Sequence, residues 1–456
     1  MKEKSYQKIP SISKILSSLD KGTSSLHEKY LICLINEEID KIRDEISDGY
    51  SFESKKEILK NIVYEIKNKT TYSLKNIING TGIVLHTGFG RAPFSGKTFR
   101  EISNRLDGYV NLEFNLVSGK RGNRQDHLRK HISSICNSES ALVVNNNAGA
   151  VMLSINEIAN NGEVIVSRGQ LVEIGGSFRV PEIIEKSGAR LKEVGTTNRT
   201  HLKDYSSAIT KKTKLLLWVH TSNYVVKGFT KSISLADLVR LGKEYSIPVM
   251  VDWGSGSFLN MKSLGIADEI PVRDIMKNKP DLLTFSGDKL VGGPQSGIIV
   301  GSKKIINKIQ LNTLYRILRS DKIAIAFLEE VLRSYNVNNF SDKNISLKML
   351  STKRSVLKKR GQEILFLIDK KKIQELRIDL VESYVEAGSG SLPEDKIESV
   401  ALSFNPKQLN VEKLSFQLRT SKHAVVGYIS KNLFFIDLKA VLQSQLKKIA
   451  TSINLL

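Results

Sequence analysis

The chain has few cysteines, and this excludes two kinds of stabilisation. Only Cys33 and Cys136 occur among its 456 residues. Two cysteines provide no disulfide framework, and their spacing does not match that of a zinc site, so we expect no metal centre. Such sparse cysteine is typical of a reducing cytoplasm, where we expect the protein to reside.

Long apolar runs are also lacking. The longest, such as LLLWV at residues 215–219, are far shorter than the roughly 20 residues that a membrane-spanning helix needs. The first ten residues, MKEKSYQKIP, contain no apolar segment of the secretory type. The sequence therefore predicts neither a transmembrane helix nor a secretion signal.

Acidic residues are scarce relative to basic ones. The chain has 47 Asp and Glu against 69 Lys and Arg, a net charge of +22. Residues 1–75 carry +2, residues 76–302 carry +8 and residues 303–456 carry +12, so no short basic tail explains the excess. Because cationic surface attracts phosphates, this charge indicates a polyanionic partner such as nucleic acid. A lysine-rich proteome would produce the same excess.

The length of the chain predicts two or three domains, and its hydrophobic content of 40% is enough to build their cores. In residues 1–70, apolar side chains recur at three- and four-residue spacing between Leu31 and Ile42, which is typical of an amphipathic helix. The stretch SDGYS interrupts this pattern before a second helical segment, KKEILKNIVYEIKN. We expect a small helical module here.

The middle of the chain, residues 71–310, has a different rhythm. From about residue 138, short apolar runs alternate with helix-sized segments; they are ALVV, EVIV, KLLLWV, IPVMV, DLLTF and GIIV. Runs that are apolar on both faces predict a parallel sheet covered by helices, that is, an α/β domain. Ligands of such sheets bind just beyond the carboxyl ends of the strands.

The last segment, residues 311–456, is expected to form a smaller α+β domain with a connecting helix. Its helical stretches lead to the strand-like SVALSF and the helix-like VEKLSFQLRT. The runs AVVGYI and LFFIDL, separated by SKN, predict a hairpin.

Small polar residues follow the first strand-like run of the middle segment. Residues 145–150, NNNAGA, lead directly into the helix-like VMLSINEIA. The N–H groups and the dipole at a helix N-terminus favour an anion, so this turn suits a phosphate. The turn does not match a Walker or dinucleotide motif, and an ordinary strand-to-helix turn would look the same.

Two further predicted strands end in ionisable side chains. KLLLWV is followed by His220, and IPVMV is followed by Asp252 and the stretch WGSGS. A carboxylate at the end of a buried strand needs a partner, and a cationic ring N–H would serve. Asp252 acting as a cap of the following turn is an equally good interpretation of that residue alone.

Lys289 lies beyond the run DLLTF, after Ser286, Gly287 and Asp288. A lone lysine in such a place usually marks a surface turn. At a water-poor strand end, however, desolvation and nearby positive charge yield a nucleophilic amine that forms Schiff bases. A phosphate turn followed by His, Asp and Lys on successive strands predicts a site for pyridoxal 5'-phosphate.

Longer stretches make the chain similar to a known family, the bacterial selenocysteine synthases or L-seryl-tRNA(Sec) selenium transferases. These belong to the aspartate-aminotransferase-like (fold type I) pyridoxal phosphate enzymes. The resemblance covers nearly the whole chain, and the stretches that carry it are NGTGIVLHTGFGRAP, NLEFNLVSGKRGNR, VVNNNAGAV, SRGQLVEIGGSFRVPEI, EVGTTNRT, VDWGSGS, SGDKLVGGPQSG and LYRILRSDK.

The resemblance implies roles for the residues at the strand ends. Lys289 would form the Schiff base with the cofactor, Asp252 would hold the pyridine nitrogen, and His220 would lie near the ring. The residues expected at the cofactor phosphate are Asn147, Ala148 and Gly149, with Ser286 as a further ligand.

The resemblance also implies that arginines face the active site and suit an anionic selenium donor; they are Arg91, Arg316 and Arg319. The planar guanidinium matches phosphate oxygens in a bidentate manner. Solvent-exposed helix positions are the alternative for Arg316 and Arg319.

The implied reaction converts seryl-tRNA(Sec) into selenocysteinyl-tRNA(Sec) by loss of water and addition of selenium from selenophosphate. In the family the N-terminal helical module binds the tRNA, and the chains form a homodecamer, a pentamer of dimers. Because residues 1–75 carry only +2, basic surface elsewhere must share the phosphate contacts, or the RNA is recognised by its shape.

Two other functions fit parts of the sequence. A related pyridoxal phosphate lyase acting on a small amino sugar or amino acid would share every cofactor residue, but it would not require the N-terminal module. A non-enzymatic RNA-binding protein would fit the charge, but it would have no use for Lys289 and Asp252 at strand ends.

Overall fold

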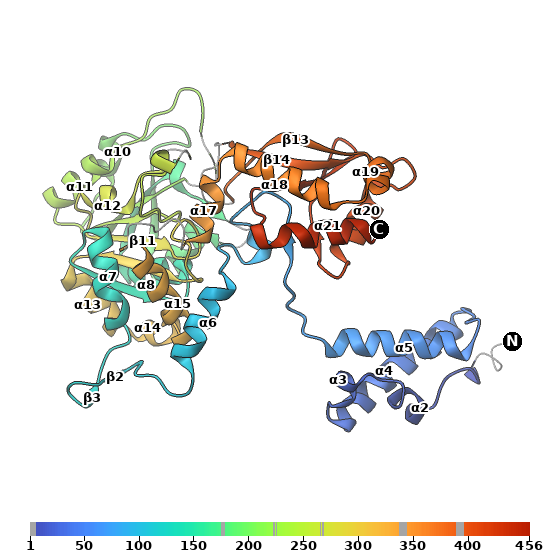
Figure 1. Ribbon diagram of the computed structural model, residues 1–456. Coiled ribbons are helices and arrows are strands. Elements are labelled where there is room, and N and C mark those ends of the chain that lie inside the picture. The colour runs from blue at the N-terminus through green and yellow to red at the C-terminus, as the bar shows by residue number, and fades with distance from the viewer. Residues whose placement is uncertain are drawn as a thin grey trace. The chain divides into compact units, whose positions relative to one another are not determined.

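The computed structural model describes residues 6–174, 178–221, 224, 226–264, 266, 269–336, 344–388 and 396–456, so part of the stretch SRGQLVEIGGSFRVPEI falls outside it. The chain divides into two compact units, Met1–Ile77 and Ile78–Leu456 (Figure 1). The predicted boundaries at residues 70 and 310 stay predictions. Among the described helices, none is both long and apolar enough to cross a bilayer.

The first unit is helical, with its own apolar core. Its helices are α2 (Ile12–Leu16), α3 (Lys21–Ser24), α4 (Glu28–Ser47) and α5 (Lys55–Thr70). The stripe predicted between Leu31 and Ile42 is the buried face of α4, and it packs against Ile58, Ile62 and Ile66 of α5. Gly49 follows α4 with a φ of 99°. This is a left-handed conformation, which is common just after a helix and which glycine adopts readily.

The second unit is built on a central sheet in which the described residues form seven strands. Their spatial order is β4-β12-β11-β10-β9-β5-β8. The strands are β4 (Ser140–Val144), β5 (Glu163–Ser167), β8 (Arg190–Val194), β9 (Thr213–Val219), β10 (Val249–Asp252), β11 (Leu282–Ser286) and β12 (Gly297–Gly301). Each apolar run of the middle segment thus corresponds to a strand, and the α/β prediction is confirmed.

The prediction of a mainly parallel sheet is confirmed, but one strand is antiparallel and one further strand was not predicted. β12 runs antiparallel to both β11 and β4, because the ten residues between Ser286 and Gly297 are too few for a crossover helix. β8 was not predicted. It lies at the edge of the sheet, and its sequence, RLKEV, is charged and partly exposed, so it lacks the apolar signature of the buried strands.

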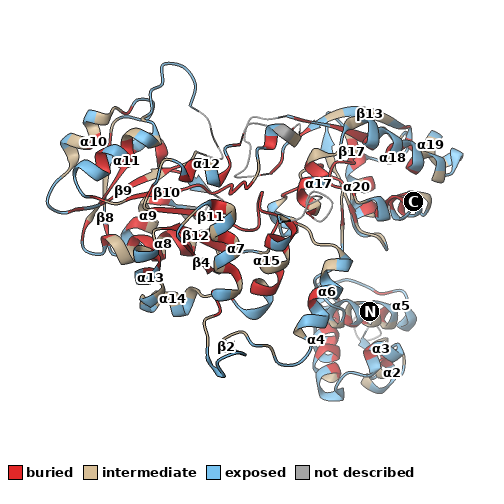
Figure 2. Ribbon diagram, turned by 60° about the vertical axis from the view of Figure 1, so that its left-hand side comes forward, coloured by how far each residue is buried: buried red, intermediate tan, exposed pale blue. Residues whose placement is uncertain are grey.

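Helices cover both faces of this sheet, and the strands are buried between them (Figure 2). Side chains of a strand alternate between the faces: Leu142 and Val144 of β4 pack with the helices α8, α9 and α13, while Ala141 and Val143 pack with α7, α12 and α15. The helices that cover the sheet are α7 (Asp126–Cys136), α8 (Asn147–Ala159), α9 (Val180–Lys186), α10 (Leu202–Ala208), α11 (Leu235–Glu244), α12 (Val272–Met276), α13 (Lys303–Leu311) and α15 (Lys322–Ser334).

The remaining elements of the middle of the chain are the helix α6, of 11 residues, and several shorter elements. They are η1 (Thr87–Phe89), α6 (Gly96–Leu106), β2 (Phe114–Asn115), β3 (Lys120–Arg121), η2 (Arg168–Gln170), β6 (Glu173–Ile174), β7 (Phe178–Arg179), η3 (Met261–Leu264) and α14 (Thr313–Leu318). β2 pairs with β3, and β6 pairs with β7, in antiparallel two-stranded sheets.

The C-terminal segment contains a sheet of four strands among the described residues, in the order β13-β14-β17-β16. Its elements are α17 (Ile345–Ser351), α18 (Arg354–Leu367), α19 (Lys370–Leu376), β13 (Ile378–Val385), β14 (Ile397–Phe404), α20 (Val411–Arg419), β15 (Val425–Val426), β16 (Tyr428–Ser430), β17 (Leu433–Asp437), η4 (Gln443–Gln445) and α21 (Leu446–Asn454). The predicted hairpin is confirmed as β16 and β17, and the helix-like VEKLSFQLRT is α20.

A short strand from the beginning of the second unit joins this C-terminal part. β1 (Ile78–Asn79) pairs in parallel with β15, and Ile78 is buried in the same apolar cluster as α18, α20 and α21. The chain continues close to β17, where the N–H of Asp437 donates to the carbonyl of Gly80 over 2.8 Å. The C-terminal core therefore includes residues from both ends of the second unit.

Gly82, just after β1, provides a test of this packing. Its φ is +80°, and a Cβ there would collide with Val385 and lie 2.8 Å from the carboxyl carbon of Asp437. We expect Gly82→Ala to lower the free energy of unfolding by about 2–4 kcal/mol. Gly108 has a similar φ, +78°, with open space around it, so Gly108→Ala should cost only about 1 kcal/mol. Equal losses in urea unfolding of the two variants would contradict this packing.

Candidate active site

The carboxyl ends of several strands meet at one edge of the central sheet, because β4, β9, β10 and β11 all run in the same direction. Asn147 follows β4, His220 follows β9, Asp252 ends β10, and Ser286 ends β11 with Lys289 three residues further. The fold thus brings the predicted strand-end residues to a common edge, where α/β sheets bind their ligands.

The carboxyl group of Asp252 accepts hydrogen bonds from two neighbouring side chains. Its Oδ1 accepts from Nδ2 of Asn147 at 2.9 Å and from Oγ1 of Thr284 at 3.3 Å. The side chain is buried, with the residue only 5% exposed. Burial raises the pKa of Asp252, although Asn147, Lys289 and Thr284 act in the opposite direction. A cationic ligand would offset the cost of burying this carboxyl group.

His220 presents a flat ring beside the end of β10. It stacks on Trp253, with ring centroids 3.8 Å apart and planes inclined by 14°. Its backbone N–H donates to the carbonyl of Asp252 over 2.9 Å, which fixes the position of the residue. Burial, assisted by the charge of Lys289, lowers the pKa of His220 to about 4. The imidazole is therefore neutral at physiological pH.

Lys289 is buried, with 3% of its surface exposed. Burial, together with the positive charge of Arg91, lowers the pKa of Lys289 to about 8, although nearby carboxylates oppose the shift. A substantial fraction of the amine is therefore unprotonated slightly above neutral pH, as a nucleophile requires.

Arg91 reaches Lys289 through the residue that precedes it. Nη1 of Arg91 lies 3.1 Å from Oδ2 of Asp288, and the N–H of Ala92 donates to the carbonyl of Asp288 at 3.3 Å. Arg91 itself has a left-handed backbone, with a φ of 59°. This ion pair links the stretch NGTGIVLHTGFGRAP to the lysine loop; that Arg91 faces an active site stays a prediction.

The predicted phosphate turn is the N-terminus of α8. The side chain of Asn146 caps the helix by accepting from the N–H of Gly149 at 2.7 Å. The N–H groups of Asn147 and Ala148 at the first turn have no acceptor within the helix, so an anion placed at this terminus would accept from them. A Cβ on Gly149 would lie 3.1 Å from Leu318 and 3.2 Å from Asn145, so the small residue permits close packing there.

The other predicted site residues, Ser286, Arg319 and Arg316, differ in their burial and their contacts. Ser286 is buried at the end of β11. Arg319 follows α14, and its backbone forms an isolated bridge with Val144 beside the phosphate turn, but its guanidinium bonds to Glu113 at 3.2 Å. Arg316 is exposed on α14, and within the described residues no hydrogen bond or ion pair joins it to the other site residues.

Several residues of the site were not predicted from the sequence. Thr284 contacts Asp252 because the two residues are paired in the register of β10 and β11, which no local motif reveals. Trp253 follows Asp252 directly, and the stretch VDWGSGS contained it without indicating its stacking on His220. Asp288 was visible beside Lys289, but its partner Arg91 is 197 residues away.

The chemistry of these groups fits a ligand with a carbonyl carbon, a cationic ring N–H and an anionic end. Lys289 would attack the carbonyl, Asp252 would bind the ring N–H, and the α8 terminus would bind the anion. Two buried atoms at this edge, Oδ1 of Asn147 and Nδ1 of His220, have no hydrogen-bond partner among the described residues. A bound polar ligand would satisfy them.

Comparison with known proteins identifies close relatives. A sequence profile of the L-seryl-tRNA selenium transferase family matches residues 77–442. The L-seryl-tRNA(Sec) selenium transferase of Carboxydothermus hydrogenoformans is 41% identical over 448 residues, covering 97% of this chain and 96% of the relative. The protein of the same name from Aquifex aeolicus is 40% identical over 452 residues, covering 98% of each chain.

A solved structure shows the same fold. D-Glucosaminate-6-phosphate ammonia-lyase matches with a TM-score of 0.57 at 18% sequence identity, covering 84% of this chain and 95% of that one. At this identity the likeness concerns the fold alone. Together with the mainly parallel central sheet and the C-terminal sheet, it confirms the predicted fold class.

The lowered pKa of Lys289 generates a prediction on amine reactivity. With carbonyl ligands removed by hydroxylamine, pulse labelling with acetic anhydride should modify Lys289 with a midpoint near pH 8, below the ~10.4 of an ordinary lysine. Arg91→Met should move the midpoint upward, since the guanidinium charge favours the neutral amine. Mass spectrometry of the peptide measures both. A midpoint near that of an ordinary lysine would show that Lys289 is solvated.

Proposed function

Because the chain belongs to the L-seryl-tRNA selenium transferase family, we propose that it converts L-seryl-tRNA(Sec) into L-selenocysteinyl-tRNA(Sec) with pyridoxal phosphate as cofactor. The near full-length similarity to its relatives carries the proposal, since about 40% identity extends over 97–98% of the chain. The buried Lys289 and Asp252 support it, because an RNA-binding protein without catalysis has no need to desolvate them.

Pyridoxal phosphate suits the groups at the sheet edge. Lys289 would bind its aldehyde, Asp252 its ring nitrogen and the N-terminus of α8 its phosphate, with His220 and Ser286 as further contacts. When bound, the cofactor supplies an electron sink for the pair of electrons released at the Cα of the seryl group.

In this proposal Lys289 acts as the general base. With the cofactor bound to the seryl group, Nζ of Lys289 would be free to take the proton from Cα, for which a pKa of about 8 is suitable. The β-hydroxyl would leave as water, and the selenium of selenophosphate would form a bond to the β-carbon; its bond to phosphorus would be broken by water, which releases phosphate. The neutral His220 contributes no charge beside the reacting carbon, since its pKa lies near 4.

The arginines favour an anionic selenium donor such as selenophosphate. Arg91 is held against Asp288, next to Lys289, and the backbone of Arg319 borders the phosphate turn. Guanidinium groups bind phosphate oxygens with paired hydrogen bonds. Arg316 would join them only if the donor or another chain reaches its exposed position on α14.

We also propose that the first unit binds tRNA and that the protein works in the cytoplasm as a homodecamer built from dimers. The separate core of Met1–Ile77 supports a module with a task of its own. Exposed apolar residues of the β2–β3 hairpin, Leu116 and Val117, support contacts between chains. Two free cysteines agree with a reducing compartment.

The alternative of a lyase acting on a small amino sugar or amino acid is not favoured. The ammonia-lyase shares only the fold, at 18% identity. The relatives named as selenium transferases match over nearly the full chain, including most of the first unit.

The proposed function predicts the behaviour of two variants. Purified protein given seryl-tRNA and selenophosphate should form selenocysteinyl-tRNA, detected by mass. Lys289→Ala should lose this activity and the yellow Schiff-base absorbance together. Asp252→Asn should keep the absorbance but lose at least about 100-fold in rate, because the ring nitrogen loses its anionic partner. Full activity of Lys289→Ala would disprove the role of this amine.

The tRNA role of the first unit is tested by deletion of residues 1–77. The shortened protein should retain the yellow cofactor absorbance but lose the gel shift with tRNA(Sec). Unchanged tRNA affinity in a coloured, folded protein would assign RNA binding to the second unit instead.

A further inference from the structure

Glu113 lies in a cluster of arginines at the base of the β2–β3 hairpin. Its Oε1 accepts from Nε of Arg124 at 2.7 Å and from Nη1 of Arg319 at 3.2 Å. Its Oε2 accepts from Nη2 of Arg121 at 2.9 Å. The carboxylate of Glu113 thus accepts hydrogen bonds from guanidinium groups of two parts of the chain that are far apart in sequence.

The arginines of this cluster differ in how firmly they are held. Arg124 is buried, with 8% exposure, and its Nη1 also donates to the carbonyl of Ser320 at 2.7 Å. The side chains of Arg319 and Arg121 are 28% and 77% exposed. Arg124 therefore anchors the cluster, whereas Arg319 and Arg121 have access to solvent and to a ligand.

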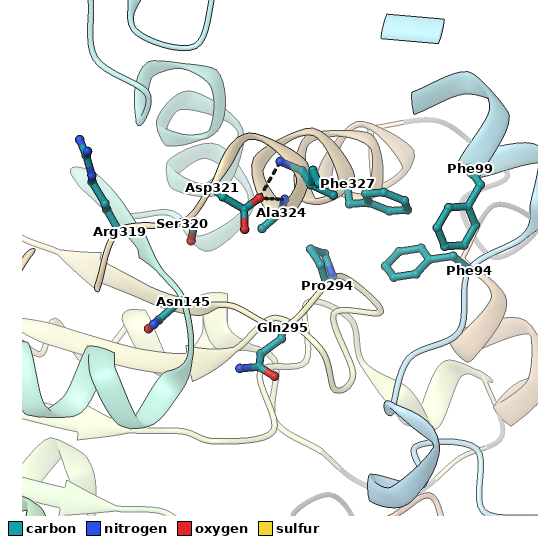
Figure 3. Close-up of a pocket in the computed structure, with 11 residues that line it drawn as sticks. Phe94, Phe99, Asn145, Pro294, Gln295, Arg319, Ser320, Asp321, Ala324 and Phe327 are labelled. Carbon is teal, nitrogen blue, oxygen red and sulfur yellow. Dashed lines mark hydrogen bonds between the residues drawn. The ribbon is translucent and has the colours of Figure 1, made fainter. Parts of the chain in front are cut away.

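The cluster carries more positive than negative charge. Burial opposes ionisation of Glu113, but hydrogen bonds and charge from Arg124, with further contributions from Arg121 and Arg319, lower its pKa. Asp321, the next carboxylate along the chain, is occupied in capping α15, where it accepts from the N–H groups of Ile323 and Ala324 (Figure 3). Among the described residues, the ion pairs of Arg121, Arg124 and Arg319 all go to Glu113, so within these pairs one negative charge faces three positive charges.

The cluster adjoins the candidate active site. Arg319 and Ser320 line a hollow of about 610 Å³ together with Asn145, which precedes the phosphate turn (Figure 3). The N–H of Asn145 donates to the carbonyl of Leu318 at 2.8 Å, so the segment carrying Arg319 is fixed to the start of α8. The guanidinium of Arg319 points away from the other labelled residues of the hollow, and its side chain is 28% exposed, so a small anion would reach it from solvent (Figure 3).

We propose that Glu113 is an internal occupant of an oxyanion site formed by Arg319, Arg121 and Arg124, and that a tetrahedral oxyanion displaces it. Carboxylate and phosphate oxygens bind the same guanidinium edges, so the two compete. Glu113 thereby sets the affinity of the site for anions and keeps the arginines ordered before a ligand arrives. The identity of the natural ligand as the selenium donor rests on the proposed function.

The experiment uses inorganic phosphate as the probe and full-length protein loaded with cofactor, so that the cofactor's own phosphate seat is filled. In Glu113→Gln the amide keeps the size of the side chain and removes the competing charge. Phosphate affinity measured by calorimetry should rise about tenfold or more, because the intramolecular competitor is weakened. Glu113→Asp, which shortens the carboxylate, should give a smaller rise and serves if the glutamine variant does not fold.

Glu330→Gln is the matched control. Glu330 also pairs with an arginine, Arg105, at 2.9 Å, and its side chain is 26% exposed against 25% for Glu113. This control should leave phosphate affinity unchanged. Unchanged or weaker phosphate binding in both Glu113 variants would overturn the proposal and leave Glu113 as a structural ion pair.

Kinetics with the substrates separate this proposal from the proposed function. A lower KM for selenophosphate in Glu113→Gln identifies the donor as the natural oxyanion. A lower KM for seryl-tRNA, with that for selenophosphate unchanged, assigns the site to an RNA phosphate and overturns the donor assignment. If phosphate affinity rises while the protein makes no selenocysteinyl-tRNA, the oxyanion site stands and the proposed function fails.

Discussion

The desolvation of Lys289 and Asp252 is the constraint on which the rest of the site depends. Both residues are almost fully buried, and burial moves their pKa values in opposite directions, down for the amine and up for the carboxyl. Neither charge would be stable there without polar neighbours, and Asn147, Thr284 and Asp288 lie around them. The shifted pKa values of these groups therefore follow from their burial at the carboxyl ends of the strands.

Strand β4 is the outermost strand of the central sheet, and it determines where α8 begins, the helix whose N-terminus suits a phosphate. An outer strand would normally leave backbone groups unpaired. Here the amide side chain of Gln125 bonds to both the N–H and the carbonyl of Val143, at 2.8 and 2.9 Å, and Leu318 accepts from Asn145. These contacts cover the edge and fix the turn from β4 into α8. The same segment positions Arg319, so the anchoring of the helix and of the arginine is shared.

The sequence was informative where a single element carries the signal. Apolar runs predicted the buried strands, and the residues that follow them predicted the strand-end groups, including Lys289 and Asp252. It was less informative where a contact depends on register or on long separation. Thr284 bonds to Asp252 only through the pairing of two strands, and Arg319 meets Glu113 across 206 residues. The strand β8 was missed because its charged sequence, at a sheet edge, lacks an apolar signature.

The pairing of β1 with β15 has a consequence for synthesis of the protein on the ribosome. Ile78 is made early, but its partner Val425 emerges only when nearly the whole polypeptide has been translated. At roughly 5–20 residues per second, the apolar side chain of Ile78 waits tens of seconds for its neighbours. The C-terminal core must therefore close after translation of the sheet that precedes it, and a nascent chain stalled before β15 would keep this early strand exposed to chaperones.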